Sequence, residues 1–303
     1  MKIVYRFSLL VIASCVGAGG FSIPSGAQAS DNSLPDSPSA LIASVVPDKP
    51  AALSEDASEV ANDPVTGSDD SGVPESPSER EAGWKTLPGN FLHDQKRIWM
   101  FPVQLAHGRH WVPTLAVAGI TTGLIYADPH AMPYFAHHQK NLDKFNDVFD
   151  AYISTGEVIS IPALLMASGY IRHDHRTVSS ALLCAEAYGD SAVVNLVMKA
   201  ITRRQRPVDV PLNGTYRDTF FNGGKSPFHG SSFPSGHTTG VFSVATVVAN
   251  RYERHKWVPY LAYGFATVIS LSRITTAAHW PSDVFLGAAI GYSTAKYVVL
   301  RPD

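Results

Sequence analysis

Cysteine is scarce in this sequence, which excludes a small domain held together by several disulfides. Its 303 residues include two cysteines, Cys15 and Cys184. Cys15 lies in an N-terminal segment that we expect to be cleaved off, so the mature chain would keep a single thiol and could form no intrachain disulfide. Cys184 stands among apolar residues with helical spacing, and we expect it to be a buried packing residue.

Long uncharged apolar runs and strand-like alternation are also scarce after residue 83. A membrane-spanning helix needs about 20 mostly apolar residues, whereas the apolar segments here are shorter or contain charged residues such as Glu157, Glu186 and Asp190. As membrane spans they would be marginal. Strand signals are sparse and no internal repeat is present, which excludes sheet-based and repeat folds.

The first 29 residues have the pattern of a secretory signal peptide. Lys2 and Arg6 precede an apolar stretch that runs to about residue 21, and Ala27-Gln28-Ala29 is a small-residue cleavage site. We therefore expect export, with the mature protein in the periplasm or otherwise outside the cytoplasm. Two alternatives stay open: an uncleaved membrane anchor, and a lipoprotein in which Cys15 carries the lipid.

Residues 30–83 predict a disordered acidic linker. They contain twelve Asp or Glu against only Lys49 and Arg80, are rich in Pro and Ser, and show no periodicity. The net charge of -2 therefore hides a division into +2 for residues 1–29, -10 for the linker and +6 for residues 84–303. A basic domain suits nucleic acid, a membrane surface or an anionic substrate. Because the basic residues form no nucleic-acid-like run and the chain is exported, we expect no nucleic-acid partner.

Residues 84–303 contain recurring apolar segments of helical length, which predicts one all-α domain, a bundle of about six core helices. An amphipathic segment at 91–101 comes first, and we favour its packing on the domain over a place on a membrane surface. The other expected helices are 112–127, 151–171, 177–202, 237–252, 258–273 and 282–300.

The expected location is soluble or peripheral, with possible membrane contact. The alternative is an integral membrane protein with about six helices. If the linker lies outside the cell membrane, six spans would leave Lys199 and Arg206 on the cytoplasmic side, which conflicts with the function of an exported enzyme.

Three short blocks near the ends of the expected helices carry the chemistry. The first runs from Lys199 to Pro207 and places Lys199 and Arg206 seven residues apart, nearly two helical turns, so both cations would share a face. Pro207 would end that helix. Alone, such a block is typical of a solvated basic helix end.

The second block is Phe233-Pro234-Ser235-Gly236-His237, directly before an apolar helical run. Ser235 is a suitable N-cap, and Gly236 permits close backbone approach, so the N–H groups of this helix start would face an anion. The block predicts a phosphate seat with a histidine beside it. Alone, it would more commonly mean a capped helix start with a surface histidine.

The third block runs from Ser272 to Asp283 and contains Arg273 and His279. Pro281 is suited to open the last helix, which leaves His279 just ahead of it and Asp283 in its first turn. A carboxylate there can accept from one imidazole nitrogen and leave the other nitrogen without a proton. That arrangement would prepare a nucleophilic histidine.

Together the blocks read KX6RP, PSGH and SRX5HX3D, and in this pattern the chain closely resembles the phosphatase branch of the type 2 phosphatidic acid phosphatase (PAP2) and vanadium haloperoxidase superfamily. The match runs from Lys199 to Asp283. The resemblance implies a PAP2-type helical bundle and a metal-independent phosphatase with a phosphohistidine intermediate. It assigns attack on phosphorus to His279, orientation of that ring to Asp283, and protonation of the leaving oxygen to His237. The phosphate oxygens would be bound by Lys199, Arg206, Ser235, Gly236 and Arg273.

Other functions fit the sequence less well. A haloperoxidase of the same superfamily would bind vanadate as its cofactor, but the resemblance there is to longer chains. A serine hydrolase is excluded because no glycine stands two residues before Ser235. We expect no metal, since the pairs at His137-His138 and His173-Asp174-His175 lie between helices without further carboxylates. A non-catalytic phosphate-binding module would need the cations but not the ordered pair of His279 and Asp283.

The substrate is left open by the sequence. Lipid phosphates such as phosphatidic acid, isoprenoid pyrophosphates and soluble phosphomonoesters all fit one phosphate seat. Residues 208–232 contain Tyr216, Phe220, Phe221 and Phe228 among Gly and Asn. This segment is either a substrate-facing lid or a loop packed on the surface.

Overall fold

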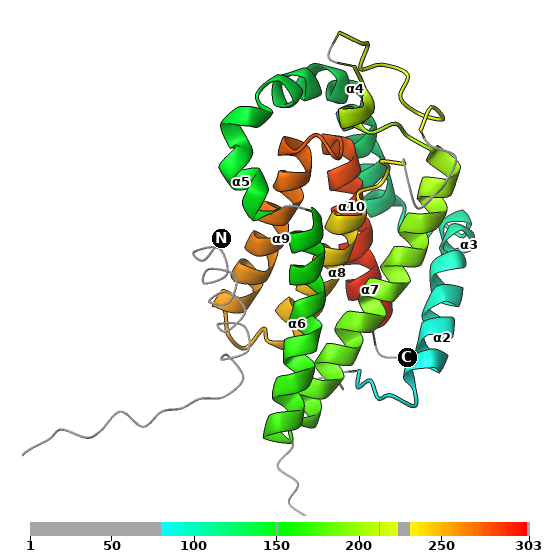
Figure 1. The fold of residues 1–303 in the computed structure, drawn as a ribbon. Helices are drawn as coiled ribbons and strands as arrows, with labels where there is room; N and C mark the ends of the chain where they lie inside the picture. Colours follow the sequence, from blue (N-terminus) through cyan, green and yellow to red (C-terminus); the bar gives the residue numbers. More distant parts are fainter. Residues whose placement is uncertain (1–79, 150, 212, 224–230, 302–303) are drawn as a thin grey trace, which may run out of the picture. The chain divides into compact units, whose positions relative to one another are not determined.

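The structure is a computed structural model, and it describes residues 80–149, 151–211, 213–223 and 231–301 (Figure 1). The expected signal peptide and the linker up to residue 79 lie outside the described residues. Within the described part the chain is helical and contains no strand. The all-α class predicted from the sequence is confirmed.

The expected helices are present with small shifts at their ends. The amphipathic segment forms α2 (Leu87–Trp99) and the short α3 (Phe101–Ala106), which has Pro102 in its first turn. A short helix that the sequence did not predict, α5 (Asp143–Val148), precedes α6. The core helices are α4 (Trp111–His137), α6 (Ala151–Arg172), α7 (His175–Thr202), α8 (Gly236–Arg251), α9 (Trp257–Thr275) and α10 (Pro281–Thr294), which continues as a π-helical turn (Ala295–Val299).

The helix α4 is longer than predicted. We expected this helix at residues 112–127, but it continues through Pro129 and Pro133 to His137. Asp128 is fully buried and forms an ion pair with Arg204 at 2.7 Å. The charge therefore has a partner inside the domain and does not end the helix.

The helix α8 lies at the centre of the described helices and packs against α7, α9 and α10 (Figure 1). Its contact with α10 is close because α10 carries glycines. A Cβ on Gly291 would lie 2.2 Å from the carbonyl oxygen of Thr239, and a Cβ on Gly287 would lie 2.7 Å from that of Ser235. Only glycine lets the backbones approach in this way, so the first turn of α8 lies directly against α10.

Residues 80–83, which we assigned to the disordered linker, pack on the helices instead. The guanidinium of Arg80 lies 2.9 Å from both Asp94 and Glu186, and it donates to the carbonyl oxygen of Val299 at 2.7 Å. From the sequence we expected Arg80 to be one of two basic residues in a disordered acidic linker. It is in fact a buried partner for carboxylates on the domain, so the packed part begins earlier than residue 84.

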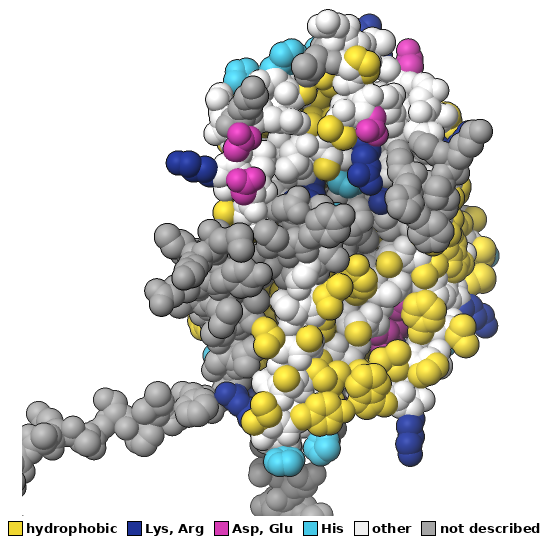
Figure 2. Space-filling view, viewed as in Figure 1, with side chains coloured by type: hydrophobic (Ala, Val, Ile, Leu, Met, Phe, Trp, Pro, Cys, Tyr) yellow, Lys and Arg dark blue, Asp and Glu magenta, His cyan; other side chains and the backbone are white. Residues whose placement is uncertain are grey.

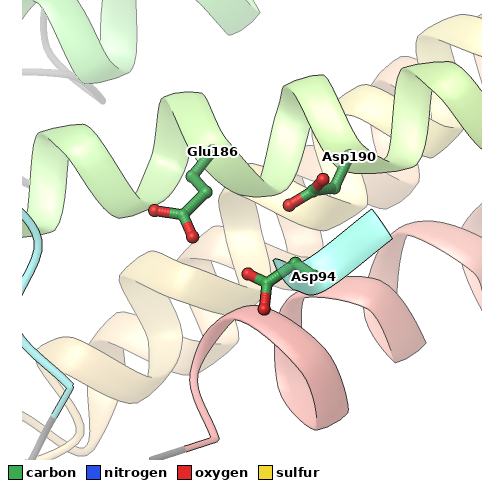
Figure 3. Close-up of side chains that lie close together, drawn as sticks. All are labelled: Asp94, Glu186 and Asp190. Carbon is green, nitrogen blue, oxygen red and sulfur yellow. The ribbon is translucent and has the colours of Figure 1, made fainter. Parts of the chain in front are cut away.

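A cluster of buried carboxylates joins α2 to α7. Asp94 of α2 points toward Glu186 and Asp190 of α7 (Figure 3), and one oxygen of each lies within 4.8 Å of the others. Gln95 donates to Asp190 Oδ1 at 2.8 Å. Burial raises the pKa of Glu186 to about 8 and that of Asp190 to about 7, and the Asp94 carboxyl adds to both effects. The cluster therefore retains protons at neutral pH, which lowers the cost of burying it.

Among the described residues, one helical stretch, 175–209, has the length and composition of a membrane span. Half of its most apolar window is buried inside the protein. The stretch contains α7, which packs against α6 and α8. A core helix of a soluble protein can have the length and composition of a membrane span.

We predict that Asp190→Asn makes the free energy of unfolding less dependent on pH. The pKa of Asp190 is raised from 3.8 to about 7, so between these values the folded chain binds a proton that the unfolded chain lacks. Stability should therefore fall as pH rises through this range, by at most about 1.4 kcal/mol per pH unit for one group. Asn removes the titration and keeps an oxygen that can accept from Gln95.

Urea unfolding at about pH 4.5 and about pH 7.5 measures this slope. Asp174→Asn is the control, because Asp174 is a partly exposed N-cap whose pKa is lowered mainly by the Thr177 hydroxyl. An unchanged slope in Asp190→Asn would show that Asp190 is ionised throughout.

Candidate active site

Lys199 and Gly236 bring the first two blocks together. Lys199 lies in the last turn of α7, and Gly236 is the first residue of α8. A Cβ on Gly236 would lie 3.4 Å from Lys199 Nζ and 3.5 Å from Asn195 Oδ1. The ammonium is thus at the start of α8, where backbone N–H groups and the helix dipole favour an anion.

Arg206 reaches this place from a loop and not from the helix. We expected Lys199 and Arg206 to share a helix face, but α7 ends at Thr202, and Arg203 is left-handed with φ of 39°. Arg206 Nε is buried and has no hydrogen-bond partner among the residues that the structure describes. Burial is the largest cause of the lowered pKa values of Lys199 and His279. The positive charge of Arg206 lowers both pKa values further. A buried cationic donor without a partner, next to a second cation, is suited to an anionic ligand.

His279 is almost completely buried, with 3% of its surface exposed. Its backbone N–H donates to the carbonyl oxygen of Arg273 at 3.0 Å, so the segment after α9 folds back on the last turn of that helix. Its Nδ1 lies 2.8 Å from the carbonyl oxygen of Ser232. A carbonyl can only accept, so Nδ1 carries the proton and Nε2 does not. Burial is the main cause that lowers the pKa of His279 below 6.5, so the imidazole is neutral at pH 7.

Asp283 lies beside this ring but is not its nearest acceptor. We expected Asp283 to accept the imidazole proton; its Oδ2 is 3.6 Å from Nδ1, whereas the Ser232 carbonyl oxygen is 2.8 Å away. Oδ2 accepts instead from the Trp280 N–H at 2.9 Å and from the Ser232 hydroxyl. Burial alone would raise the pKa of Asp283, but His279, the Arg204 charge and Ser232 together hold it below 3.8. Asp283 therefore stays ionised and acts on His279 through its charge.

Ser235 and His237 lie at the start of α8, whereas Arg273 lies in the last turn of α9. Ser235 is the N-cap of α8, and its hydroxyl oxygen accepts from the Thr238 N–H at 3.4 Å. Its own N–H donates to the carbonyl oxygen of Asp283 at 3.0 Å, which joins the second block to the third. His237 is half-buried in the first turn of α8. Arg273 is 2% exposed and holds Ser272 Oγ through Nε and Nη2 at 3.0 and 2.9 Å.

Metal-ligating side chains gather elsewhere. Among the residues that the structure describes, the one group of three that could share an ion is Asp94, Glu186 and Asp190, and none of these belongs to the three blocks. The adjacent His137 and His138 each bond through Nδ1 to a backbone carbonyl one turn earlier, at 2.6 and 2.8 Å.

Part of the 208–232 segment packs against the site. The ring of Tyr216 meets that of Trp280 edge-on at 6.0 Å between centroids, and Phe220 meets Phe233 at 5.5 Å. The described part of the segment therefore packs against the second block through Phe233 and against the third block through Trp280. Phe228 lies outside the described residues.

Three residues that the sequence did not single out complete the site: Ser232, Arg204 and Asp128. Ser232 directly precedes the second block. Arg204 stands inside the first block, where spacing gave no reason to prefer it to Arg203. Asp128 belongs to α4, far from the blocks in sequence. A charge in an apolar helix is costly without a partner, and this was the signal that could have identified Asp128.

Residues 180–302, less than half of the chain, match the sequence model of the PAP2 superfamily. This part of the chain is similar to members of that superfamily. All eight site residues predicted from the sequence lie inside the matched range, as do Ser232 and Arg204. Asp128 lies outside it.

Individual similar proteins cover parts of the chain. A lipid A 1-phosphatase of Porphyromonas gingivalis is 42% identical over 62 residues, which is 20% of this chain and 14% of that protein. Phosphatidylglycerophosphatase B of Bacillus subtilis is 25% identical over 154 residues, 48% of this chain and 70% of that protein. A crystal structure of a transmembrane PAP2 type phosphatidylglycerolphosphate phosphatase from Bacillus subtilis aligns with a TM-score of 0.39 and 21% identity, over 68% of this chain and 94% of that one.

Proposed function

We propose that this protein is a metal-independent phosphatase that transfers a phosphoryl group to His279 and then to water. The observation that carries the proposal is the position of His279: its neutral imidazole presents an unprotonated Nε2, and Lys199 and Arg206 lie close enough to lower its pKa. The match to the PAP2 superfamily model and the phosphatase names of similar proteins support the same function.

The substrate phosphate would bind at the start of α8. Lys199, Arg206 and Arg273 would supply positive charge, Ser235 its hydroxyl, and Gly236 its backbone N–H. Phosphoryl transfer requires mainly positioning and positive charge around the equatorial oxygens. Three cations and a helix start can provide both.

The reaction would proceed in two steps. In the first, Nε2 of His279 attacks phosphorus, the bond to the leaving oxygen breaks, and His237 gives that oxygen a proton. In the second, His237 takes a proton from water, the resulting hydroxide oxygen bonds to phosphorus, and the bond from phosphorus to Nε2 breaks. Inorganic phosphate leaves and both imidazoles return to their starting states. General acid catalysis of this kind contributes about 10²–10⁴-fold in rate.

The surface favours a substrate presented by a membrane. Figure 2 shows hydrophobic side chains gathered over the lower half of one face, with histidine and basic side chains along the lower edge of this area and further charged side chains above it. A soluble monomer rarely exposes a large contiguous apolar patch. We propose that the apolar helices contact lipid and that the substrate is a lipid phosphate or an isoprenoid pyrophosphate. Side chains of α4, α6 and α9 that are more than half exposed include Val112, Leu115, Ile120, Ile159, Ile171 and Tyr260.

Phosphate release by the purified full chain tests both parts of the proposal. The panel contains phosphatidic acid and an isoprenoid pyrophosphate in detergent micelles, and a soluble phosphomonoester, each with and without EDTA. We predict hydrolysis of the micellar substrates in EDTA. We also predict that His279→Ala lowers kcat by at least about 1,000-fold, because no other group replaces the nucleophile.

His255→Ala is the matched control, since His255 is exposed between α8 and α9. Circular dichroism checks that both variants fold. Substantial turnover by folded His279→Ala would contradict the nucleophile, activity on the soluble ester alone would contradict the lipid substrate, and activity restored only by added metal would contradict metal independence.

The pH profile should report on Lys199. Burial, with the charge of Arg206 added, lowers the pKa of Lys199 to about 8, against the opposing charge of Asp283. Loss of this proton removes a positive charge from the phosphate seat, so kcat/KM should fall above about pH 8. Lys199→Arg keeps its charge at that pH, and its residual activity should fall only at higher pH. The same alkaline limb in the variant would assign the titration to another group.

A further inference from the structure

Arg204 is a buried cation shared between two carboxylates. It is 2% exposed, and its Nη1 donates to Asp283 Oδ1 while its Nη2 donates to Asp128 Oδ2, both at 2.7 Å. Nη1 also lies 2.7 Å from Ser282 Oγ, and Nε donates to Thr219 Oγ1 at 3.2 Å. These contacts use the planar, forked geometry of a guanidinium, which lysine lacks.

Aromatic rings fix the plane of this guanidinium. Its Cζ lies 4.6 Å from the ring centroid of Phe220 and 4.6 Å from that of Trp280. Stacking of this kind stabilises a desolvated cation. It also leaves Arg204 little freedom to follow a moving carboxylate.

Asp128 is the second carboxylate that contacts Arg204. Its Oδ1 accepts from the Ser282 N–H at 3.2 Å, and its Oδ2 accepts from the Ser282 hydroxyl as well as from Arg204. Asp128 thereby binds the first turn of α10, one residue before Asp283. It comes from α4, outside the PAP2 domain match.

Arg204 and Asp128 are connected to the proposed nucleophile, His279, through Asp283. Arg204 binds Oδ1, which leaves Oδ2 as the oxygen 3.6 Å from His279 Nδ1. We propose that Arg204 and Asp128 are positioning residues: together they set the orientation of Asp283, and Asp128 offsets the positive charge of Arg204 so that the Asp283 charge stays available to His279. This inference rests on the proposed function of His279.

The charges around His279 come from several elements. Asp283 of α10 is its negative neighbour, while Lys199 of α7 and Arg206 of the following loop are its positive ones. Arg273 lies in the last turn of α9, and its carbonyl oxygen accepts from the His279 N–H. Loss of the Asp128 charge would leave the Arg204 charge less compensated beside Asp283, which disfavours the imidazolium.

Two variants test the pair. Arg204→Lys keeps the charge but loses the fork, and we expect kcat to fall about 100-fold while KM changes less than about threefold, because substrate contacts are untouched. Asp128→Asn keeps one oxygen that can accept from Arg204 and the Ser282 hydroxyl but removes the charge and the acceptor for the Ser282 N–H, and we expect the pKa of His279 to fall further. ¹⁵N NMR of labelled histidine measures this pKa directly, without any turnover. Arg203→Lys is the matched control, since the adjacent Arg203 is exposed.

The outcomes separate the two proposals. If the wild-type chain released no phosphate from any substrate, the proposed function would fail, and the NMR titration would still decide whether Asp128 acts on His279. Wild-type kcat in folded Arg204→Lys, or an unchanged His279 titration in Asp128→Asn, would overturn the positioning role. If Arg204→Lys does not fold, the Asp128→Asn titration decides alone.

Discussion

The Asp283 carboxylate is the point at which the elements of the site meet. It is fully buried, and a buried carboxylate is tolerated only when it is paired and hydrogen-bonded. The Trp280 N–H, the Ser232 hydroxyl and Arg204 meet this need from three different segments. Satisfying one charge therefore fixes the start of α10, the approach to α8 and the end of α7 relative to one another. His279 is held in the middle of this arrangement.

Positive and negative side chains lie close together around His279, and their effects on its pKa oppose one another. Lys199 and Arg206 lie near each other, so each disfavours the charge of the other, and a phosphate bound at the start of α8 would relieve that repulsion. The charge of Asp283 opposes the lowering of the Lys199 and His279 pKa values. The close contact of α8 and α10 at Gly287 and Gly291 keeps these groups in place. Positive charge that is left incompletely paired is the property by which such a site attracts an anion.

Much of this could be predicted from the sequence, because helix ends are governed by local chemistry. Ser235 as an N-cap and Pro281 at the start of α10 were predicted from residue type and position alone. Tertiary partners could not be predicted in this way. Asp128 was not singled out, and Arg80 was assigned to a disordered linker, yet the side chains of both are buried in ion pairs. The carbonyl of Ser232 was missed because a backbone acceptor leaves no mark in the sequence.

The central claim is that His279 Nε2 bonds to phosphorus. Rapid mixing of enzyme with a hydrolysed substrate, followed by an alkaline quench that preserves phosphohistidine and by peptide mass spectrometry, tests it directly. We predict a transient phosphate on the peptide that contains His279, located on its imidazole. A phosphate found on His237 or Ser235, or single-turnover hydrolysis with no phosphorylated enzyme at any time, would contradict it.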